Sequence, residues 1–143
     1  MAIKFYKSND PYGFLNNFYR SRFFLYHHWW NWVEAPYQAM KTMDVEAYDK
    51  IRLATTPREA RDIGQTVPIH DSWEEIKIQV MYDCCLAKFT QNQDLMDKLM
   101  GTGEEELIED SPVDSFWGCG ADGKGQNHLG KVLMRVRKDL RNG

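Results

Sequence analysis

Polar side chains in the segment VEAPYQAMK have the types and the spacing that acid–base or imine chemistry requires. Tyr37, Gln38 and Lys41 share one face of a helix that would begin near Pro36, and Glu34 stands at its entrance. A carboxylate transfers protons and an amine attacks a carbonyl or an imine, so Glu34 and Lys41 are candidate catalytic residues. The alternative is that the same stripe is a solvated helix face.

The segment GCGADGKGQNHLGK, residues 118–131, matches two phosphate-binding patterns by its letters. It contains the G-x-G-x-x-G of dinucleotide-binding proteins and the G-x-x-x-x-G-K of phosphate loops. Both patterns need a buried strand directly before them, and the preceding EDSPVDSFW cannot form one. Gly125 also replaces the Ser or Thr that would hold Mg²⁺, and the only nearby downstream acid, Asp139, lies within a predicted helix. We therefore predict that this loop binds neither NAD nor ATP in these ways.

The same loop retains features that suit a small anionic ligand. Asp114 and Trp117 precede glycines that allow a ligand to approach the backbone closely, the first of them Gly118. A helix that begins at Asn127 would present free N–H groups to a phosphate. The residues leave open the alternative of a surface loop in which Asn127 only caps the helix.

Trp73 and the histidines are the remaining candidates for binding roles. Trp73 opens another predicted helix and is either a core residue or a platform on which a base stacks. The histidines lack the paired spacing of metal ligands, so we expect no metal site, and no motif calls for a cofactor.

The periodicity of apolar residues predicts the elements that must position these groups. Helices are expected over residues 34–55, 56–64, 72–89 and 94–100 and from 127 onward, and strands over Ile3–Tyr6 and Arg22–Tyr26. Thr56 is the expected N-cap of the second helix, and Ser72 with Glu75 has capping-box spacing at the third. The prediction is a mainly α fold: residues 1–143 as a single compact helical domain with a few short strands near the N-terminus.

Composition limits the classes of partner. The net charge of −3 argues against general binding to duplex DNA but allows an anionic ligand in a local pocket. The 3 cysteines have no disulfide spacing, which favours a reduced, cytoplasmic setting. No apolar run reaches membrane length, so we expect no membrane association. No feature of the sequence indicates an obligate protein partner. The aromatic segment FFLYHHWWNW is either core or an exposed interaction surface.

Taken together, several segments resemble the YbiA-like proteins of the NADAR superfamily. They are YGFLNNFY, W…VEAPYQAMK, DSWEEIKIQVMYDCCLAKFTQN and LIEDSPVDSFWGCGADGKGQNHLGKVLM, in the family's order and over nearly the whole chain. The resemblance implies a compact, mainly helical fold and N-glycosidase activity. It implies as substrates either ribosylamino-pyrimidine intermediates of riboflavin biosynthesis or ADP-ribose on guanine bases of nucleotides and nucleic acid.

The resemblance also assigns site residues by motif position. The matching positions are Glu34, Lys41, Trp73, Asp114, Trp117, Gly118 and Asn127, together with Asn17 in the N-terminal segment. The chain departs from the family pattern at Ala35-Pro36, where a His usually follows the glutamate, and at Asn16, where a Ser is usual.

Both implied substrates join ribose C1′ to an exocyclic amine, and such a glycosylamine can open to an imine. Lys41 is then a candidate Schiff-base nucleophile, while Glu34 or Asp114 would move protons and activate water. Trp73 and Trp117 would sandwich the base or the ribose, and the helix end at Asn127 would hold phosphate. Direct hydrolysis without an imine is the rival mechanism, and a non-catalytic module that binds ADP-ribose or another nucleotide is the rival function.

Overall fold

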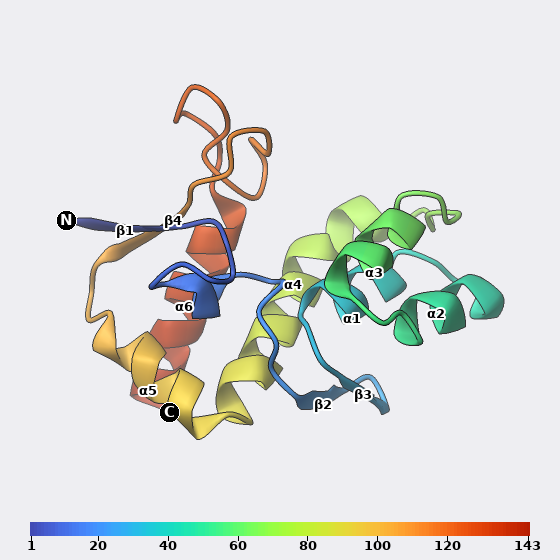
Figure 1. Ribbon diagram of the computed structural model, residues 1–143, viewed down its shortest axis with the longest axis horizontal. Coiled ribbons are helices and arrows are strands. Elements are labelled where there is room, and N and C mark those ends of the chain that lie inside the picture. The colour runs from blue at the N-terminus through green and yellow to red at the C-terminus, as the bar shows by residue number, and fades with distance from the viewer.

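Two long helices, α4 (Trp73–Thr90) and α6 (His128–Asn142), pack against each other and carry the other elements (Figure 1). The computed structural model describes all residues from 1 to 143. Helix α5 (Gln93–Gly101) connects to α4 through a short turn and also contacts α6. The apolar stripe predicted on α4 is confirmed, because Trp73, Val80 and Cys84 are all buried. The mainly α fold class is therefore confirmed.

Three short helices, α1 (Glu34–Ala39), α2 (Val45–Arg52) and α3 (Pro57–Gly64), pack together at one end of α4 (Figure 1). The prediction of one helix over residues 34–55 was wrong. The chain leaves the helix after Ala39, and Asp44 starts a new one by accepting hydrogen bonds from the N–H groups of Glu46 and Ala47. A side-chain cap of this kind favours a helix start at the residue that provides it.

The two predicted helix caps had different outcomes. Thr56 caps α3 as expected, since its hydroxyl accepts from the N–H of Glu59 at 3.0 Å. Ser72 precedes α4 but makes no capping bond, so the expected capping box with Glu75 is absent. The backbone of Ser72 is not extended (φ −89°, ψ 2°), whereas a capping hydroxyl requires an extended residue.

The strands form two separate pairs. Strand β1 (Ala2–Phe5) runs parallel to β4 (Glu106–Glu109), with Phe5 opposite Glu109. Strands β2 (Phe23–Leu25) and β3 (His28–Trp30) form an antiparallel hairpin. The expected strands near residues 3–6 and 22–26 are confirmed within a few residues. Strands β3 and β4 were not predicted, and β4 lies far from the N-terminus in sequence although it pairs with the first strand.

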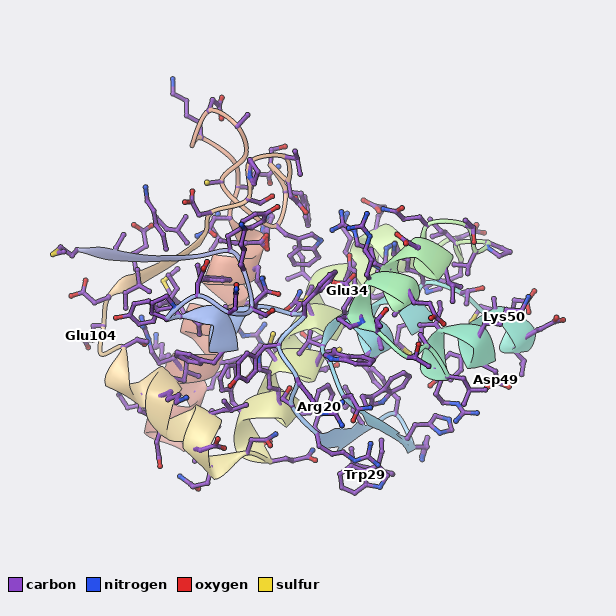
Figure 2. The ribbon with its side chains drawn as sticks, viewed as in Figure 1. Arg20, Trp29, Glu34, Asp49, Lys50 and Glu104 are labelled. Carbon is purple, nitrogen blue, oxygen red and sulfur yellow. The ribbon has the colours of Figure 1, made fainter.

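The aromatic segment after β1 divides between core and surface. Phe23, Trp30 and Trp32 are buried, while Phe24 and Trp29 on the hairpin are exposed and contact each other edge to face. Trp29 projects from the hairpin at the lower edge of Figure 2.

The cysteines are all free and buried. None of the helices has the length and apolar character needed to cross a membrane.

Candidate functional site

A cavity of about 630 Å³ lies where α1, α3, the N-terminal segment and the loop after β4 meet. Figure 2 shows Glu34 near the centre of the molecule, whereas Asp49 and Glu104 lie at its periphery. The cavity is lined mainly by polar and charged side chains: Tyr6, Lys7, Ser8, Asn9, Asn16, Asn17, Phe18, Glu34, Tyr37, Gln38, Lys41, Arg58, Arg61, Gln65, Met81, Glu109, Ser111, Val113, Asp114 and Trp117. No group of three or more His, Cys, Asp or Glu side chains is arranged to hold a metal ion.

Helix α1 supplies one wall of the cavity. Glu34 and Gln38 are buried one turn apart, and Nε2 of Gln38 donates to Oε2 of Glu34 at 2.5 Å. Gly64 at the end of α3 lies against the Gln38 amide, and a Cβ at position 64 would overlap its oxygen. A glycine there lets α3 approach α1 closely enough to hold Gln38 in place.

The Ala35-Pro36 departure is compatible with this wall. Pro36 lies in the first turn of α1, where a backbone N–H has no partner within the helix. Its carbonyl still accepts from the N–H of Met40 at 3.1 Å. At the helix entrance, the N–H of Glu34 donates to the carbonyl of Asn17 at 3.2 Å, which joins the N-terminal segment to the candidate catalytic helix.

Lys41 follows the end of α1 and is half-buried beside Tyr37, with its Nζ 5.9 Å from the centre of the tyrosine ring. The backbone of Lys41 is held because its carbonyl accepts from the N–H of His70 at 2.9 Å. Burial lowers the pKa of Lys41; the nearby Glu34 acts in the opposite direction, and Arg61 lowers it further. Burial likewise raises the pKa of Glu34, opposed by its hydrogen bond from Gln38.

The loop after β4 supplies the opposite wall. Oδ1 of Asp114 accepts from the N–H groups of Phe116 at 2.9 Å and Trp117 at 2.8 Å. Ser111 supports the same turn, since its hydroxyl accepts from the N–H of Asp114 at 3.0 Å. The Trp117 ring stands edge-on to Tyr37, with ring centres 5.5 Å apart. The structure therefore brings Asp114 and Trp117 to the same cavity as the α1 residues.

Trp73 does not line the cavity. It is 3% exposed and packs against Tyr37, with ring centres 5.1 Å apart. Tyr37 thus stands between Trp73 and Trp117, and the expected sandwich of a ligand between the two tryptophans is not formed by this arrangement. Trp73 supports Tyr37 from behind, and the aromatic faces available to a ligand come from Tyr37 and Trp117.

Gly118 and Asn127 also lie outside the lining. Asn127 adopts a left-handed backbone conformation (φ 52°), and its side chain does not cap α6. Its Oδ1 accepts from the N–H of Glu109 at 3.0 Å and its Nδ2 donates to the carbonyl of Leu107 at 2.9 Å. The N–H of Asn127 itself donates to the Gly118 carbonyl at 3.0 Å.

The N-terminus of α6 therefore does not offer the expected phosphate site. The N–H groups of His128 and Leu129 donate to the carbonyls of Phe116 and Trp117, both at 3.0 Å. A helix end binds an anion through unpaired N–H groups, and here the loop's own carbonyls already pair with them. Residues 110–117 also separate the glycine loop from β4. Both nucleotide-binding motifs require a strand directly before the loop, so neither geometry is present.

Sequence reasoning missed several lining residues. Glu109 was missed because β4 itself was not recognised. Burial raises the pKa of Glu109 to about 7, with Asp114 and Glu34 adding to the rise and Arg61 opposing it. Arg58 and Arg61 lie one turn apart on α3, a spacing that was visible in the predicted helix 56–64.

Asn17, which was predicted, lines the cavity as well. Its Nδ2 lies 3.5 Å from the sulfur of Met81 on α4, and its Oδ1 is buried without a hydrogen-bond partner. A buried acceptor without a partner is costly unless a ligand or water completes it.

Comparisons with known proteins agree with the earlier resemblance. The NADAR domain family model matches residues 4–141. An N-glycosidase of Nostoc punctiforme is 42% identical, covering 99% of this chain and 94% of that protein. A riboflavin biosynthesis protein of Vibrio vulnificus is 39% identical over 96% of this chain, which corresponds to 38% of that longer protein.

The N-glycosidase YbiA of Escherichia coli is 35% identical, covering 96% of this chain and 88% of that protein. Its NMR structure superimposes with a TM-score of 0.92 at 34% identity, covering 99% of this chain and 86% of that one. From the family model, the relatives and the shared fold, we conclude that the chain belongs to the NADAR domain family.

Proposed function

We propose that this protein is an N-glycosidase that hydrolyses the bond between ribose C1′ and an exocyclic amine of a heterocycle. The observation that carries the proposal is that Lys41, whose pKa is lowered, the buried carboxyl of Glu34 and Asp114 all line one cavity. An amine and two carboxyl groups provide a nucleophile and the proton-transfer groups for such a hydrolysis. Relatives that are named N-glycosidases support the same activity.

The lining suits a phosphorylated riboside. Lys7, Arg58 and Arg61 surround the cavity with positive charge although the chain as a whole is acidic, and they are the groups that would bind a phosphate. The unpaired Oδ1 of Asn17 would accept a hydrogen bond from a ribose hydroxyl. Tyr37 and Trp117 would contact the base.

Relatives named riboflavin biosynthesis proteins favour a ribosylamino-pyrimidine phosphate as substrate. ADP-ribose attached to guanine has the same C1′–exocyclic nitrogen bond and is the second substrate class. Removal of that group would make the protein an ADP-ribosyl glycohydrolase.

The chemistry proceeds through a lysine imine. The ribose ring of the glycosylamine opens, so that O4′ becomes a hydroxyl and C1′ becomes an imine carbon. The neutral amine of Lys41 adds to C1′, the C1′–N bond to the heterocycle breaks with its electron pair leaving on the nitrogen, and a proton completes the departing amine. Water then adds to the Lys41 imine and releases the sugar. Glu34 and Asp114 line the same cavity and would transfer protons to and from these atoms.

Mass-spectrometric detection of released base and sugar tests the activity. The panel contains a ribosylamino-pyrimidine 5′-phosphate, a guanosine ADP-ribosylated on its exocyclic amine, and inosine monophosphate, whose ribose is attached to a ring nitrogen. We expect release from one or both of the first two and none from the third. Glu34→Gln and Asp114→Asn should each lower turnover by about a hundredfold or more. Glu46→Gln, an exposed change on α2, is the matched control.

Three other outcomes would contradict parts of this proposal. Tight binding of a panel compound without release would establish the non-catalytic binding module instead. Equal release from inosine monophosphate would contradict the specificity for exocyclic amines. Full activity of Glu34→Gln or of Asp114→Asn would remove that residue from proton transfer.

A further inference from the structure

The cavity contains a third carboxyl group, that of Glu109, which has no role in the proposed lysine-imine mechanism so far. Glu109 is the last residue of β4 and reaches the cavity from the side opposite α1. Its carboxyl group makes no hydrogen bond and no ion pair with the protein. The charged groups that act on its pKa are Asp114 in the loop after β4, Glu34 on α1 and Arg61 on α3.

The backbone at Glu109 is held on every side. Its N–H donates to Oδ1 of Asn127 at 3.0 Å, and its carbonyl accepts from the N–H of Cys119 at 2.9 Å. The next N–H, of Asp110, donates to the carbonyl of Phe5 at 2.7 Å, which continues the pairing of β4 with β1. A side chain held this rigidly at a cavity wall is placed there reproducibly, as a group that acts on a bound molecule must be.

The three carboxyl groups differ in what they can donate. Glu34 accepts a hydrogen bond from Gln38, and Asp114 accepts two from backbone N–H groups, so both are arranged as acceptors. Glu109 accepts none. Burial and the two neighbouring carboxyl groups favour the protonated form of Glu109, and no hydrogen bond to its carboxyl group opposes them.

We propose that Glu109 is the general acid that protonates the departing exocyclic amine. The inference rests on the proposed function and adds the source of the proton. As the C1′–N bond breaks, its electron pair remains on the nitrogen and the carboxyl proton of Glu109 moves to that nitrogen, leaving a carboxylate. Water then attacks C1′ of the Lys41 imine, and one of its protons returns to Glu109 while Lys41 is released.

The raised pKa of Glu109 agrees with this role. At a pKa of about 7 the group is half protonated near neutral pH, which suits an acid that must be recharged in each cycle. Lys7, Lys41, Arg58 and Arg61 also face the cavity, and Arg61 opposes the rise by stabilising the carboxylate.

The test compares kcat/KM against pH for the wild-type protein and Glu109→Gln on the substrate that the panel identifies. For the wild type, kcat/KM depends on the neutral amine of Lys41 and the protonated carboxyl group of Glu109 together, so it should rise and then fall with pH, with one limb set by the Glu109 pKa of about 7. Glu109→Gln should lower kcat/KM by about a hundredfold or more and abolish the fall while retaining the rise. Glu106→Gln, an exposed change on the same strand, should leave the whole profile unchanged.

Chemical rescue separates a proton donor from a structural group. In Glu109→Ala, added formate should restore part of kcat, and most at low pH, where formic acid is present. A Glu109→Gln protein that keeps the falling limb, or that retains activity within about twofold of the wild type, would overturn the acid role while leaving the N-glycosidase proposal intact. A wild-type protein that cleaves no panel compound would overturn both.

Discussion

At the scale of single residues, the cavity shifts an amine and a carboxyl group towards their neutral forms. Burial lowers the pKa of Lys41 and raises the pKa of Glu34, although each charge partly stabilises the other. The neutral amine is the form that attacks a carbon atom, and a neutral carboxyl group is the form that gives up a proton. Lys41 is therefore better suited to nucleophilic attack than an exposed lysine.

Borohydride trapping tests the nucleophile. Reduction during turnover should convert the transient imine into a stable secondary amine, so the protein should gain the mass of the sugar fragment. Peptide mapping should place the adduct on Lys41, in the segment YQAMK. Lys41→Arg should form no adduct, because its guanidinium stays protonated and is a poor nucleophile. An active wild-type protein without any adduct, together with good turnover by Lys41→Arg, would favour direct attack by water.

At the scale of elements, Asn127 joins β4 to the start of α6. Its side chain pairs with the backbone of Leu107 and of Glu109, and Gly130 allows the close approach, since a Cβ there would overlap the Leu107 carbonyl and the Asn127 amide. Asn127 therefore acts on the cavity through the strand end that carries Glu109.

Asn127→Ala tests this connection. The change leaves the Leu107 carbonyl and the Glu109 N–H without partners, and each such group costs about 1–3 kcal/mol. We expect the free energy of unfolding in urea to fall by about 2–4 kcal/mol and kcat to fall with it, as Glu109 loses its support. Lys124→Ala, at an exposed position of the glycine loop, should change neither. Loss of activity in Lys124→Ala with an unaffected Asn127→Ala would revive the phosphate-loop interpretation.

At the scale of the whole molecule, the ionised carboxyl groups of the cavity lower the stability of the folded state. Carboxyl groups buried near one another destabilise the folded state when they ionise. Glu109 has an ordinary pKa of 4.5 and a folded-state pKa of about 7. Its contribution to stability is therefore fully present below pH 4.5 and is lost as the pH rises through about 7.

Thermal unfolding of Glu109→Gln against pH measures that cost. The variant cannot ionise at position 109, so it should lose less stability than the wild type between pH 5 and pH 8. At pH 8, the penalty for ionising Glu109 should lower the free energy of unfolding of the wild type by on the order of 3 kcal/mol. The variant avoids this penalty, so its melting temperature relative to the wild type should rise by several degrees between the two pH values. Circular dichroism melts at both pH values give the comparison. A constant difference between the two proteins at pH 5 and pH 8 would contradict a raised pKa at Glu109.

Much of the local structure was determined by the sequence alone. The cap at Thr56 and the apolar stripe of α4 both depend on residues within a few positions of one another, and Tyr37, Gln38 and Lys41 line one cavity although Lys41 follows the end of α1. Short-range patterns of this kind are read directly from residue order. The same holds for the failure of the glycine loop as a nucleotide-binding motif, because its flanking residues are visible beside it.

Only the tertiary structure decided which side chains meet. Strand β4 is recognisable only through its pairing with β1 at the other end of the chain, so Glu109 had no signal in the sequence. Asn127 looked like a helix cap or a phosphate ligand, but its side chain pairs with the distant β4 backbone, and loop carbonyls pair with the N–H groups of the helix end. Trp73 and Tyr37 lie on different helices, and only their packing shows which ring faces the cavity. Burial and long-range pairing depend on which elements come together in space, and the order of residues along one element does not contain that information.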